Sequence, residues 1–195
     1  MIAGYILTGG KNRRMKGVKK LFLQYRGKTF LERIETAMGQ FSKIYLSVEN
    51  TAYYEEAGLP MIVDIYPGIG PMGGIYSGLY TCEEEALFVV ACDMPLLNEK
   101  IITRVCEVYQ KEKKVTIVQT GERLQPLVGI YPAAVLPLLD EMIEAKEYRM
   151  RDLIARTEVS VIQLEESDQA LKNINTPEEY QKLKGDWNGR EIEPF

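Results

Sequence analysis

Short apolar segments alternate with helix-like segments along nearly the whole chain, and this alternation limits the fold more than any other feature. Apolar runs predict strands at 3–7, 43–48, 59–63, 86–92, 115–119, 127–131 and 159–164. Apolar residues three and four positions apart predict helices at 28–40, 51–57, 74–82, 98–112, 133–145, 149–156 and 177–184. The run at 86–92 is typical of a central strand covered on both faces. We therefore expect an α/β fold: a Rossmann-like, three-layer domain with a mostly parallel sheet.

The length of 195 residues suits one domain, which we expect to span 1–184, with 185–195 as a flexible tail. The first residues carry no basic region before their apolar run, and no apolar run approaches the ~20 residues needed to cross a bilayer. Three cysteines leave one unpaired and form no metal-type pair, so we expect reduced core thiols. A cytoplasmic protein without a membrane partner is the expectation.

Charge and the absence of histidine exclude several classes of function. The net charge of −4 gives no support for non-specific nucleic-acid binding. With no histidine in the chain, Ser-His-Asp catalysis, histidine acid–base chemistry and histidine-ligated metals are all excluded. The chemistry must therefore use carboxylates, cations, backbone amides or a metal held by oxygen atoms.

The segment after the first predicted strand has the composition of an anion-binding loop. Gly9 and Gly10 have no Cβ, so their amides can approach a ligand closely. Six of the 24 lysines and arginines follow. They are Lys11, Arg13, Arg14, Lys16, Lys19 and Lys20. The segment is neither a Walker A motif nor G-x-G-x-x-G, and the alternative is a solvated basic loop. The glycine pair at a strand end favours a triphosphate site, because arginine forks and lysine charges suit phosphate oxygens.

Two aspartates directly follow apolar strands, where ligands bind in open α/β sheets. Asp93 follows the run at 86–92 and would hold Mg²⁺, which prefers carboxylate, phosphate and water oxygens. The alternative for Asp93 is a helix N-cap. Asp64 ends the strand at 59–63 and would contact the nucleotide or a water near the metal, the alternative being an Asx turn. Further along, Gly70, Gly73 and Gly74 could bring backbone close to a ligand at a helix start, although tight-turn geometry also explains that segment.

Five motifs together resemble those of the MobA-type molybdenum cofactor guanylyltransferases. They are LTGGKNRRM with the following KK, D with YPGIGPMGGIYSGL, ACDMP, QPLVGIY and NINTPEE. The motifs run in order from residue 7 to residue 179, so the resemblance covers nearly the whole chain. It implies a fold like that of the nucleotide-diphospho-sugar transferases. It also implies GTP and Mg²⁺ as co-substrate and cofactor, and molybdopterin as acceptor.

The resemblance assigns roles residue by residue. The positions implied to bind nucleotide are Leu7, Thr8, Gly9, Gly10, Arg14, Lys20, Ser47, Asp64 and Asp93. Of these, Arg14, Lys20 and Asp93 would be catalytic, with Asp93 as the metal ligand. The positions implied to bind the acceptor are Gly73, Gly74, Gln125, Pro126, Asn173 and Asn175.

The sequence also departs from the family pattern. Thr8 stands in place of the usual alanine, Lys16 in place of a common glycine, and Lys19 in place of a common aspartate. Ser47 occupies the position of an asparagine that touches the nucleotide in similar proteins. The Gly9-Gly10 pair is like that of guanylyltransferases, whereas cytidylyltransferase relatives tend to have Ala-Gly.

The NINTPEE segment has a second, structural interpretation. Thr176 as N-cap, Pro177 at the first helical position and Glu179 at the third form a capping box, which explains much of the motif. Asn173 and Asn175 are the residues of this segment that we extend to a ligand.

The predicted reaction is the transfer of GMP from GTP to molybdopterin, with or without molybdenum, releasing pyrophosphate. A phosphate nucleophile is ionised at neutral pH, so the chemistry needs no general base and is compatible with the lack of histidine. Two alternatives stay open: a CTP-dependent enzyme acting on molybdopterin or on a sugar or isoprenoid phosphate, and a nucleotide-binding sensor without catalysis. The resemblance further implies a P-loop GTPase partner and molybdoenzyme chaperones.

Overall fold

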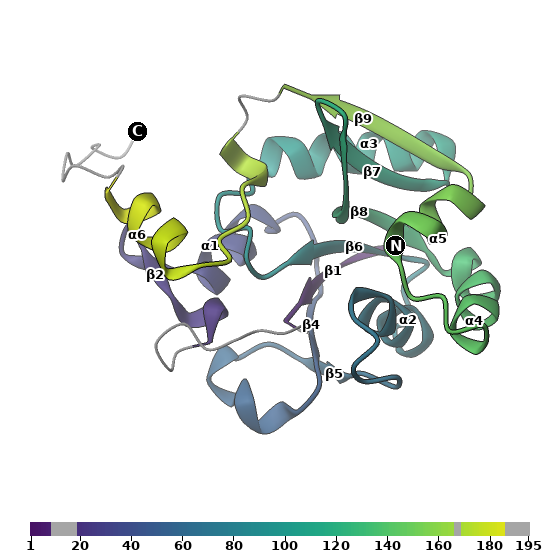
Figure 1. Cartoon of the computed structure of the whole chain (residues 1–195), viewed down its shortest axis with the longest axis horizontal. Helices are drawn as coiled ribbons and strands as arrows, with labels where there is room; N and C mark the ends of the chain where they lie inside the picture. Colours follow the sequence, from purple (N-terminus) through teal and green to yellow (C-terminus); the bar gives the residue numbers. More distant parts are fainter. Residues whose placement is uncertain (9–18, 166–168, 186–195) are drawn as a thin grey trace.

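The protein is described by a computed structural model at residues 1–8, 19–165 and 169–185, and its centre is a seven-stranded sheet (Figure 1). In chain order the strands are β1 (Ile2–Leu7), β4 (Ile44–Val48), β5 (Met61–Val63), β6 (Ala86–Ala91), β7 (Val115–Thr120), β8 (Arg123–Pro132) and β9 (Val159–Leu164). Their order in the sheet is β5-β4-β1-β6-β8-β7-β9. Within this sheet β8 is antiparallel to both neighbours, and the other pairings are parallel. The expected mostly parallel α/β domain is confirmed.

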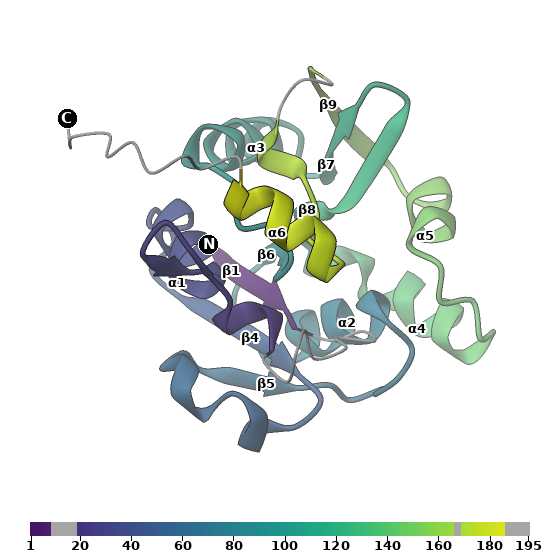
Figure 2. The same ribbon diagram turned by 60° about the vertical axis from the view of Figure 1, so that its left-hand side comes forward.

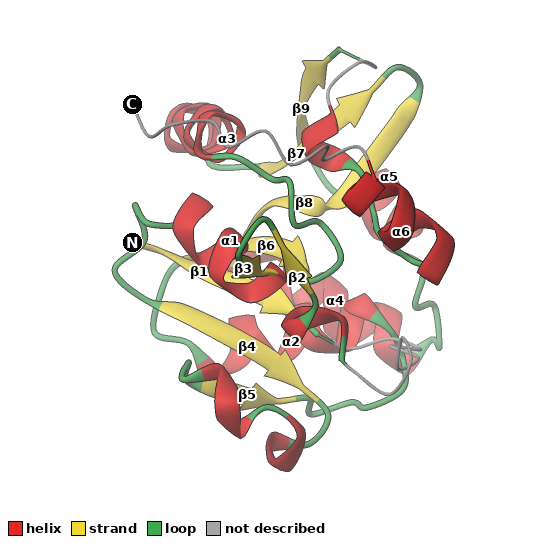
Figure 3. Ribbon diagram, turned by 90° about the vertical axis from the view of Figure 1, so that its left-hand side faces the viewer, coloured by secondary structure: helices red, strands yellow, loops and turns green. Residues whose placement is uncertain are grey.

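Helices cover both faces of the sheet, as Figure 3 shows. They are α1 (Phe30–Ala37), α2 (Pro71–Thr81), α3 (Glu99–Glu112), α4 (Leu136–Glu144), α5 (Met150–Arg156) and α6 (Pro177–Gly185). Side chains of α1 and α3 share one core cluster with Ile6, Phe88 and Val90. Those of α2, α4 and α5 share the other with Tyr5 and Leu87. Because alternate strand residues point to opposite faces, a wholly apolar strand such as β6 serves both layers.

A small hairpin and several 3-10 turns complete the described structure. The hairpin consists of β2 (Gln24–Tyr25) and β3 (Lys28–Thr29). The 3-10 turns are η1 (Lys20–Phe22), η2 (Thr51–Tyr53), η3 (Glu55–Ala57), η4 (Ala133–Val135) and η5 (Gln169–Leu171). In the described residues no helix is both long and apolar enough to cross a membrane. The three cysteines are free thiols, with Cys92 and Cys106 buried and Cys82 half-buried.

Several expected element boundaries were wrong, each for a local reason. The helix expected at 28–40 begins only at Phe30, because Thr29 forms a capping box and the two residues before Phe30 pair in the hairpin. The segment 51–57 forms two 3-10 turns in place of a helix, interrupted at Tyr54. The helix expected at 74–82 begins earlier, at Pro71, which follows Gly70 with a φ of 77°.

Two further segments differ from expectation. The strand expected at 127–131 extends to Arg123–Pro132, because its first half pairs with the end of β7 across a bulge. The helix expected at 133–145 starts as the 3-10 turn η4 before α4. The strand at 159–164 has the expected bounds. The tail expected at 185–195 lies outside the described residues except for Gly185, the last residue of α6.

Helix α6 lies against the segment that follows Lys20, although the two are at opposite ends of the chain (Figures 1 and 2). Ile174 and Leu183 form a third buried cluster with Leu23, Tyr25 and Phe30. The Tyr180 hydroxyl donates a hydrogen bond to Gln24 O at 2.7 Å. The ring of Tyr180 also meets Phe30 edge-on, with centroids 6.0 Å apart. These contacts place the C-terminal segment beside the first part of the chain.

Candidate active site

Backbone pairing aligns the carboxyl ends of four adjacent parallel strands. Cys92 N donates to Leu7 O at 3.1 Å, and Thr8 N donates to Ser47 O at 3.2 Å. Asp64 N donates to Val48 O at 2.9 Å. Residues that follow β1, β5 and β6 therefore meet at one edge of the sheet, together with the end of β4, where open α/β folds bind their ligands.

Asp93 follows β6 by two residues and is mostly buried, its side chain being 17% exposed. The N-cap of α3 is Asn98, whose side chain accepts from Ile101 N, so Asp93 is not a helix cap. Asp93 Oδ2 lies 3.7 Å from Lys20 Nζ, while Oδ1 is buried and accepts no hydrogen bond from the described residues. Burial raises the pKa of this carboxyl, and the nearby Lys20 partly opposes the shift.

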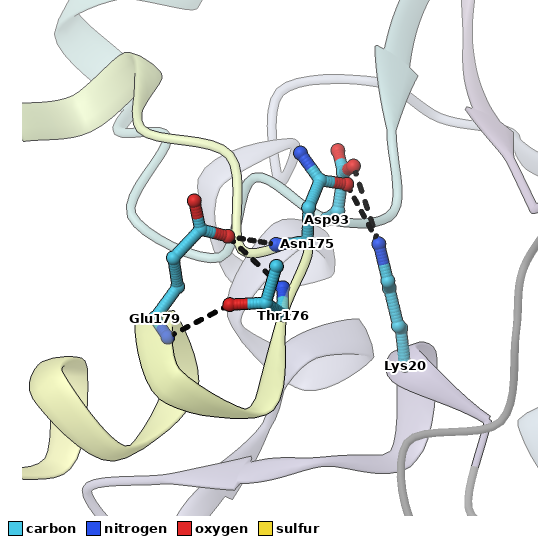
Figure 4. Close-up of polar contacts among 5 residues, drawn as sticks. All are labelled: Lys20, Asp93, Asn175, Thr176 and Glu179. Atoms are coloured by element: carbon cyan, nitrogen blue, oxygen red, sulfur yellow. Dashed lines mark hydrogen bonds and ion pairs between the residues drawn. The ribbon is translucent and has the colours of Figure 1, made fainter.

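Lys20 is the first residue of η1 and is buried to a degree unusual for a lysine, with 8% of the whole residue exposed. The next residue, Leu21, is fully buried in the core. The backbone of η1 therefore lies close to the core, and so does Lys20. Lys20 Nζ donates to Asn175 Oδ1 at 2.8 Å in addition to its ion pair with Asp93. The structure thus brings together three of the predicted site residues: Lys20, Asp93 and Asn175 (Figure 4).

The C-terminal segment closes this side of the site (Figure 4). Ile174 N donates to Asp93 O at 2.8 Å, joining the segment to the turn that follows β6. The expected capping box is present: Glu179 N donates to Thr176 Oγ1 at 3.2 Å, and Thr176 N donates to Glu179 Oε2 at 3.0 Å. Glu179 Oε2 also accepts from Asn175 N at 2.5 Å. These hydrogen bonds lower the pKa of Glu179, which is therefore ionised at neutral pH.

A second polar group lies at the ends of β1, β4 and β5. Thr8 is buried, and its hydroxyl donates to Ser47 O at 2.5 Å. Ser47 is fully buried, and its hydroxyl donates to Asp64 Oδ1 at 2.8 Å. Burial raises the pKa of Asp64, with Ser47 opposing the shift. Ser47 thus orients the Asp64 carboxyl, and Thr8 binds the backbone of Ser47. The direct nucleotide contacts expected of Thr8, Ser47 and Asp64 stay predictions.

The two glycines expected to line the acceptor side have packing reasons of their own. A Cβ on Gly73 would lie 2.4 Å from Tyr66 O, and one on Gly74 would lie 2.5 Å from Ser47 Oγ. Helix α2 therefore packs closely on the loop before it and on β4 because these residues lack side chains. The turn itself uses Gly68 and Gly70, which have positive φ. A ligand contact at Gly73 or Gly74 stays a prediction.

The remaining acceptor-side candidates lie on β8 and in the segment before α6. Gln125 is buried, and its Nε2 donates to Thr120 Oγ1 at 3.5 Å. Pro126 O accepts from the Tyr131 hydroxyl at 2.6 Å. Asn173 Oδ1 is buried and accepts no hydrogen bond from the described residues.

Part of the expected nucleotide site lies outside the described residues. Gly9, Gly10 and Arg14 fall there, as do the neighbouring cations Lys11, Arg13 and Lys16. Lys19 is described: its Nζ lies 4.4 Å from the centre of the Tyr53 ring and 5.0 Å from that of Tyr54. Lys19 therefore makes a cation–π contact with the segment that follows β4.

The carboxylate of Asp93 suits a divalent metal. Within residues 1–8, 19–165 and 169–185 no three acidic or cysteine side chains form a metal-binding group. A metal here would therefore rely on Asp93, with phosphate and water oxygens completing its shell, as Mg²⁺ commonly does. The buried Oδ1 atom, which has no hydrogen-bond donor in the described part of the chain, is an available hard ligand, so the residues fit a divalent metal.

Sequence reasoning missed two features of this site. It recognised the capping box at Thr176 but not the additional bond from Asn175 N to Glu179. It also missed Arg33, whose Nε donates to Pro95 O at 2.9 Å and whose guanidinium lies 5.0 Å from the Tyr25 ring centre. The Thr-Pro-Glu-Glu motif signals the cap itself. No local pattern signals the bond from Arg33 to Pro95, because the two residues are 62 positions apart.

Taken with its fold, the site defines a class: an α/β protein with a lysine–aspartate pair at the carboxyl edge of a parallel sheet, as expected of nucleotide-binding proteins. The comparison with protein families agrees. Residues 4–161 match the family described as MobA-like NTP transferase domain. The chain belongs to this family of nucleotidyltransferases.

Individual relatives span nearly the whole chain. A Flavobacterium johnsoniae protein named probable molybdenum cofactor guanylyltransferase is 32% identical, with 92% of this chain and 94% of the relative covered. A Clostridium perfringens protein of the same name is 31% identical, with 91% and 93% covered. The molybdenum cofactor guanylyltransferase of Vibrio parahaemolyticus is 29% identical, with 89% and 90% covered.

Solved structures share the fold. An Aquifex aeolicus protein aligns with a TM-score of 0.75 at 27% identity, covering 89% of this chain and 93% of its own. The molybdopterin-guanine dinucleotide biosynthesis protein A of Archaeoglobus fulgidus has a TM-score of 0.76 at 19% identity, covering 94% and 97%. The 2-C-methyl-D-erythritol 4-phosphate cytidylyltransferase of Thermus thermophilus has a TM-score of 0.69 at 13% identity, covering 93% and 96%. A protein named for molybdopterin-guanine dinucleotide biosynthesis and a cytidylyltransferase thus share one fold. The fold alone therefore does not determine which nucleotide base is bound.

Proposed function

We propose that this protein transfers GMP from GTP to molybdopterin, with or without bound molybdenum, and releases pyrophosphate. The product is the guanine dinucleotide form of the molybdenum cofactor. The observation that carries the proposal is the buried Asp93–Lys20 pair at the carboxyl end of β6, in which Asp93 Oδ1 accepts no hydrogen bond from any described residue. The names of relatives that match nine-tenths of the chain support the choice of base and acceptor.

The reaction is an in-line displacement at the α-phosphorus of GTP. A terminal phosphate oxygen of the acceptor forms the new P–O bond, and the bond from the α-phosphorus to the bridging oxygen of the β-phosphate breaks. Lys20 supplies a positive charge beside the leaving pyrophosphate, and Arg14 is proposed to do the same. The acceptor phosphate is already ionised, so no side chain needs to remove a proton.

The remaining residues bind and orient the substrates. Asp93 would hold Mg²⁺, which when bound neutralises charge on the α- and β-phosphates. Asp64, held by Ser47, would contact the nucleotide beyond the ends of β4 and β5. Asn173, Asn175 and Gln125 would bind the pterin through side-chain amides. A P-loop GTPase and molybdoenzyme chaperones are proposed as partners on the resemblance alone.

Pyrophosphate release tests the proposal directly. The purified protein is incubated with molybdopterin and Mg²⁺, and with either GTP or CTP in parallel. Release that requires molybdopterin and is faster with GTP supports the proposal, whereas a preference for CTP contradicts the assigned base. A protein that binds GTP but never releases pyrophosphate is a nucleotide sensor and not an enzyme.

A further inference from the structure

Two helices of this chain begin with the same capping motif, and one of the two makes an additional contact. In the α1 box, Thr29 N donates to Glu32 Oε2 at 2.6 Å, and Glu32 N donates to Thr29 Oγ1 at 3.1 Å. The α6 box has the equivalent pair of bonds between Thr176 and Glu179. Glu179 Oε2 also accepts from Asn175 N, the residue before the cap. The additional contact goes beyond what capping a helix needs.

The residue held by this additional contact is the one that contacts Lys20. Asn175 Oδ1 accepts from Lys20 Nζ at 2.8 Å, while Lys20 Nζ lies 3.7 Å from Asp93 Oδ2 (Figure 4). On the other side of Asn175, Ile174 N is bound to Asp93 O. The short segment 174–176 is therefore held at both ends, by the turn after β6 and by the Glu179 carboxylate. Its backbone position determines where the amide of Asn175 lies.

The lysine and the aspartate at the end of this series of contacts are enclosed, whereas Asn175 is exposed and Glu179 is half-buried. Lys20 and Asp93 have side chains that are 10% and 17% exposed. An ammonium in so enclosed a position needs hydrogen-bond acceptors to offset its burial, so the places of its acceptors determine where Lys20 Nζ lies. Glu179 lies nearer the surface, on the first turn of α6, and contacts neither Lys20 nor Asp93 by a hydrogen bond or ion pair in the described residues.

We propose that Glu179 is a positioning residue for nucleotidyl transfer: through Asn175 it sets the place of the Lys20 ammonium beside Asp93. The inference rests on the proposed function for its catalytic consequence, and on the described contacts for its geometry. Glu179 itself touches neither substrate nor metal. Its loss leaves Lys20 present but badly placed, which lowers the turnover and weakens binding of the pyrophosphate that Lys20 faces.

The chain offers a matched control, because Glu32 performs the same capping chemistry in a box that contains no residue of the site. The variants are E179A, E179Q and E32A, compared for melting temperature, kcat, KM for GTP, and the affinity for inorganic pyrophosphate with Mg²⁺ measured by calorimetry. We expect E179A to lower kcat and pyrophosphate affinity by about tenfold, the scale of lost outer-shell partners. E32A should lower the melting temperature similarly but change both values by less than about twofold.

Two comparisons exclude a merely structural effect. The side-chain oxygen of E179Q can still accept from the backbone amides, so this variant should recover most of the lost affinity. The double variant N175A/E179A should bind pyrophosphate no more weakly than N175A alone, because Glu179 acts through Asn175. The inference is wrong if E179A changes kcat and pyrophosphate affinity no more than E32A does. It is also wrong if the affinity losses of N175A and E179A add in the double variant.

The pyrophosphate measurement also separates this inference from the proposed function. If the wild-type protein fails to release pyrophosphate from GTP and molybdopterin, the proposed reaction is wrong, yet the pyrophosphate affinities of E179A and E32A still decide the role of Glu179. If the wild-type protein binds no pyrophosphate, Lys20 is not an anion ligand and the inference fails. If E179A does not fold, the comparison of E179Q with E32Q replaces it, with a smaller expected loss in E179Q alone.

Discussion

Asp64 and Asp93 lie near the carboxyl ends of parallel strands in the same sheet, yet the structure surrounds them differently. Asp93 faces a cation, Lys20 Nζ, and one of its oxygens has no donor among the residues that the structure describes. Asp64 accepts from the Ser47 hydroxyl. Burial raises the pKa of both. Position at a strand end therefore brings a carboxylate to the site, while its partners decide its chemistry. Asp93 has an oxygen available for a metal, and Asp64 is an oriented acceptor.

The largest effect is expected from Asp93→Asn. The neutral amide is a poor ligand for a divalent metal, so kcat should fall by about 10³-fold, since bound metal contributes several kcal/mol to such transition states. The measurement is pyrophosphate release with GTP, molybdopterin and Mg²⁺, and circular dichroism checks the fold. Near-wild-type transfer by a folded variant would show that Asp93 does not hold the metal.

Lys20→Met comes next, because it removes the charge and keeps most of the apolar stem. We expect kcat to fall by roughly 10²-fold, the usual cost of one lost donor at a developing negative charge. A metal titration of the variant serves as control, since the requirement for metal should persist. An unchanged kcat would mean that the cation next to Asp93 only neutralises the resting carboxylate.

Ser47→Ala would make Asp64 more like Asp93 by removing its donor. The partly buried carboxylate then loses a hydrogen bond, and the free energy of unfolding should fall by about 1 kcal/mol. If Asp64 is an oriented nucleotide contact, KM for GTP should rise severalfold while kcat changes little. Urea unfolding and steady-state kinetics give the two values. A lower kcat with unchanged KM would contradict the proposed division between the two aspartates.

The smallest effect concerns the pH dependence of stability at Asp64. The pKa of its carboxyl is raised in the folded state, so the folded protein binds the proton more tightly than the unfolded chain does. This contribution favours folding below the unfolded pKa of about 3.9 and is lost as pH rises through the folded pKa. Asp64→Asn, measured without nucleotide, should therefore be slightly more stable than the wild type at pH 7. This stability advantage should vanish at about pH 3.5. An advantage that persists in acid would contradict the prediction.

The contrast between the two aspartates also marks how far the sequence alone could go. That both aspartates lie at one edge follows from the apolar runs before them, because parallel strands end together. That Asp93 has a lysine partner while Asp64 has a hydroxyl partner depends on packing between distant segments. Lys20 and Asn175 are 155 positions apart, and no local periodicity predicts their contact.

The fold was predictable for a related reason, and its errors were local. Apolar periodicity located every strand of the main sheet, since burial on both faces leaves a strong pattern in a run such as β6. The hairpin of β2 and β3 and the 3-10 turns at 51–57 left no such pattern, because they are too short to repeat one. Helix starts depended on caps such as Thr29, whose role becomes clear only when its partner residue is known.

The contact between Lys20 and Asn175 has a consequence for the time course of synthesis. A chain leaving the ribosome presents β1 and the following lysine early, and the strands of the sheet can assemble in order as they emerge. The amide that orients this lysine is made 155 positions later. A nascent chain thus carries most of its sheet before it can carry a finished site, and chains truncated before Ile174 should be inactive, because they lack both the Asn175 amide and the residues that cover Leu23 and Phe30.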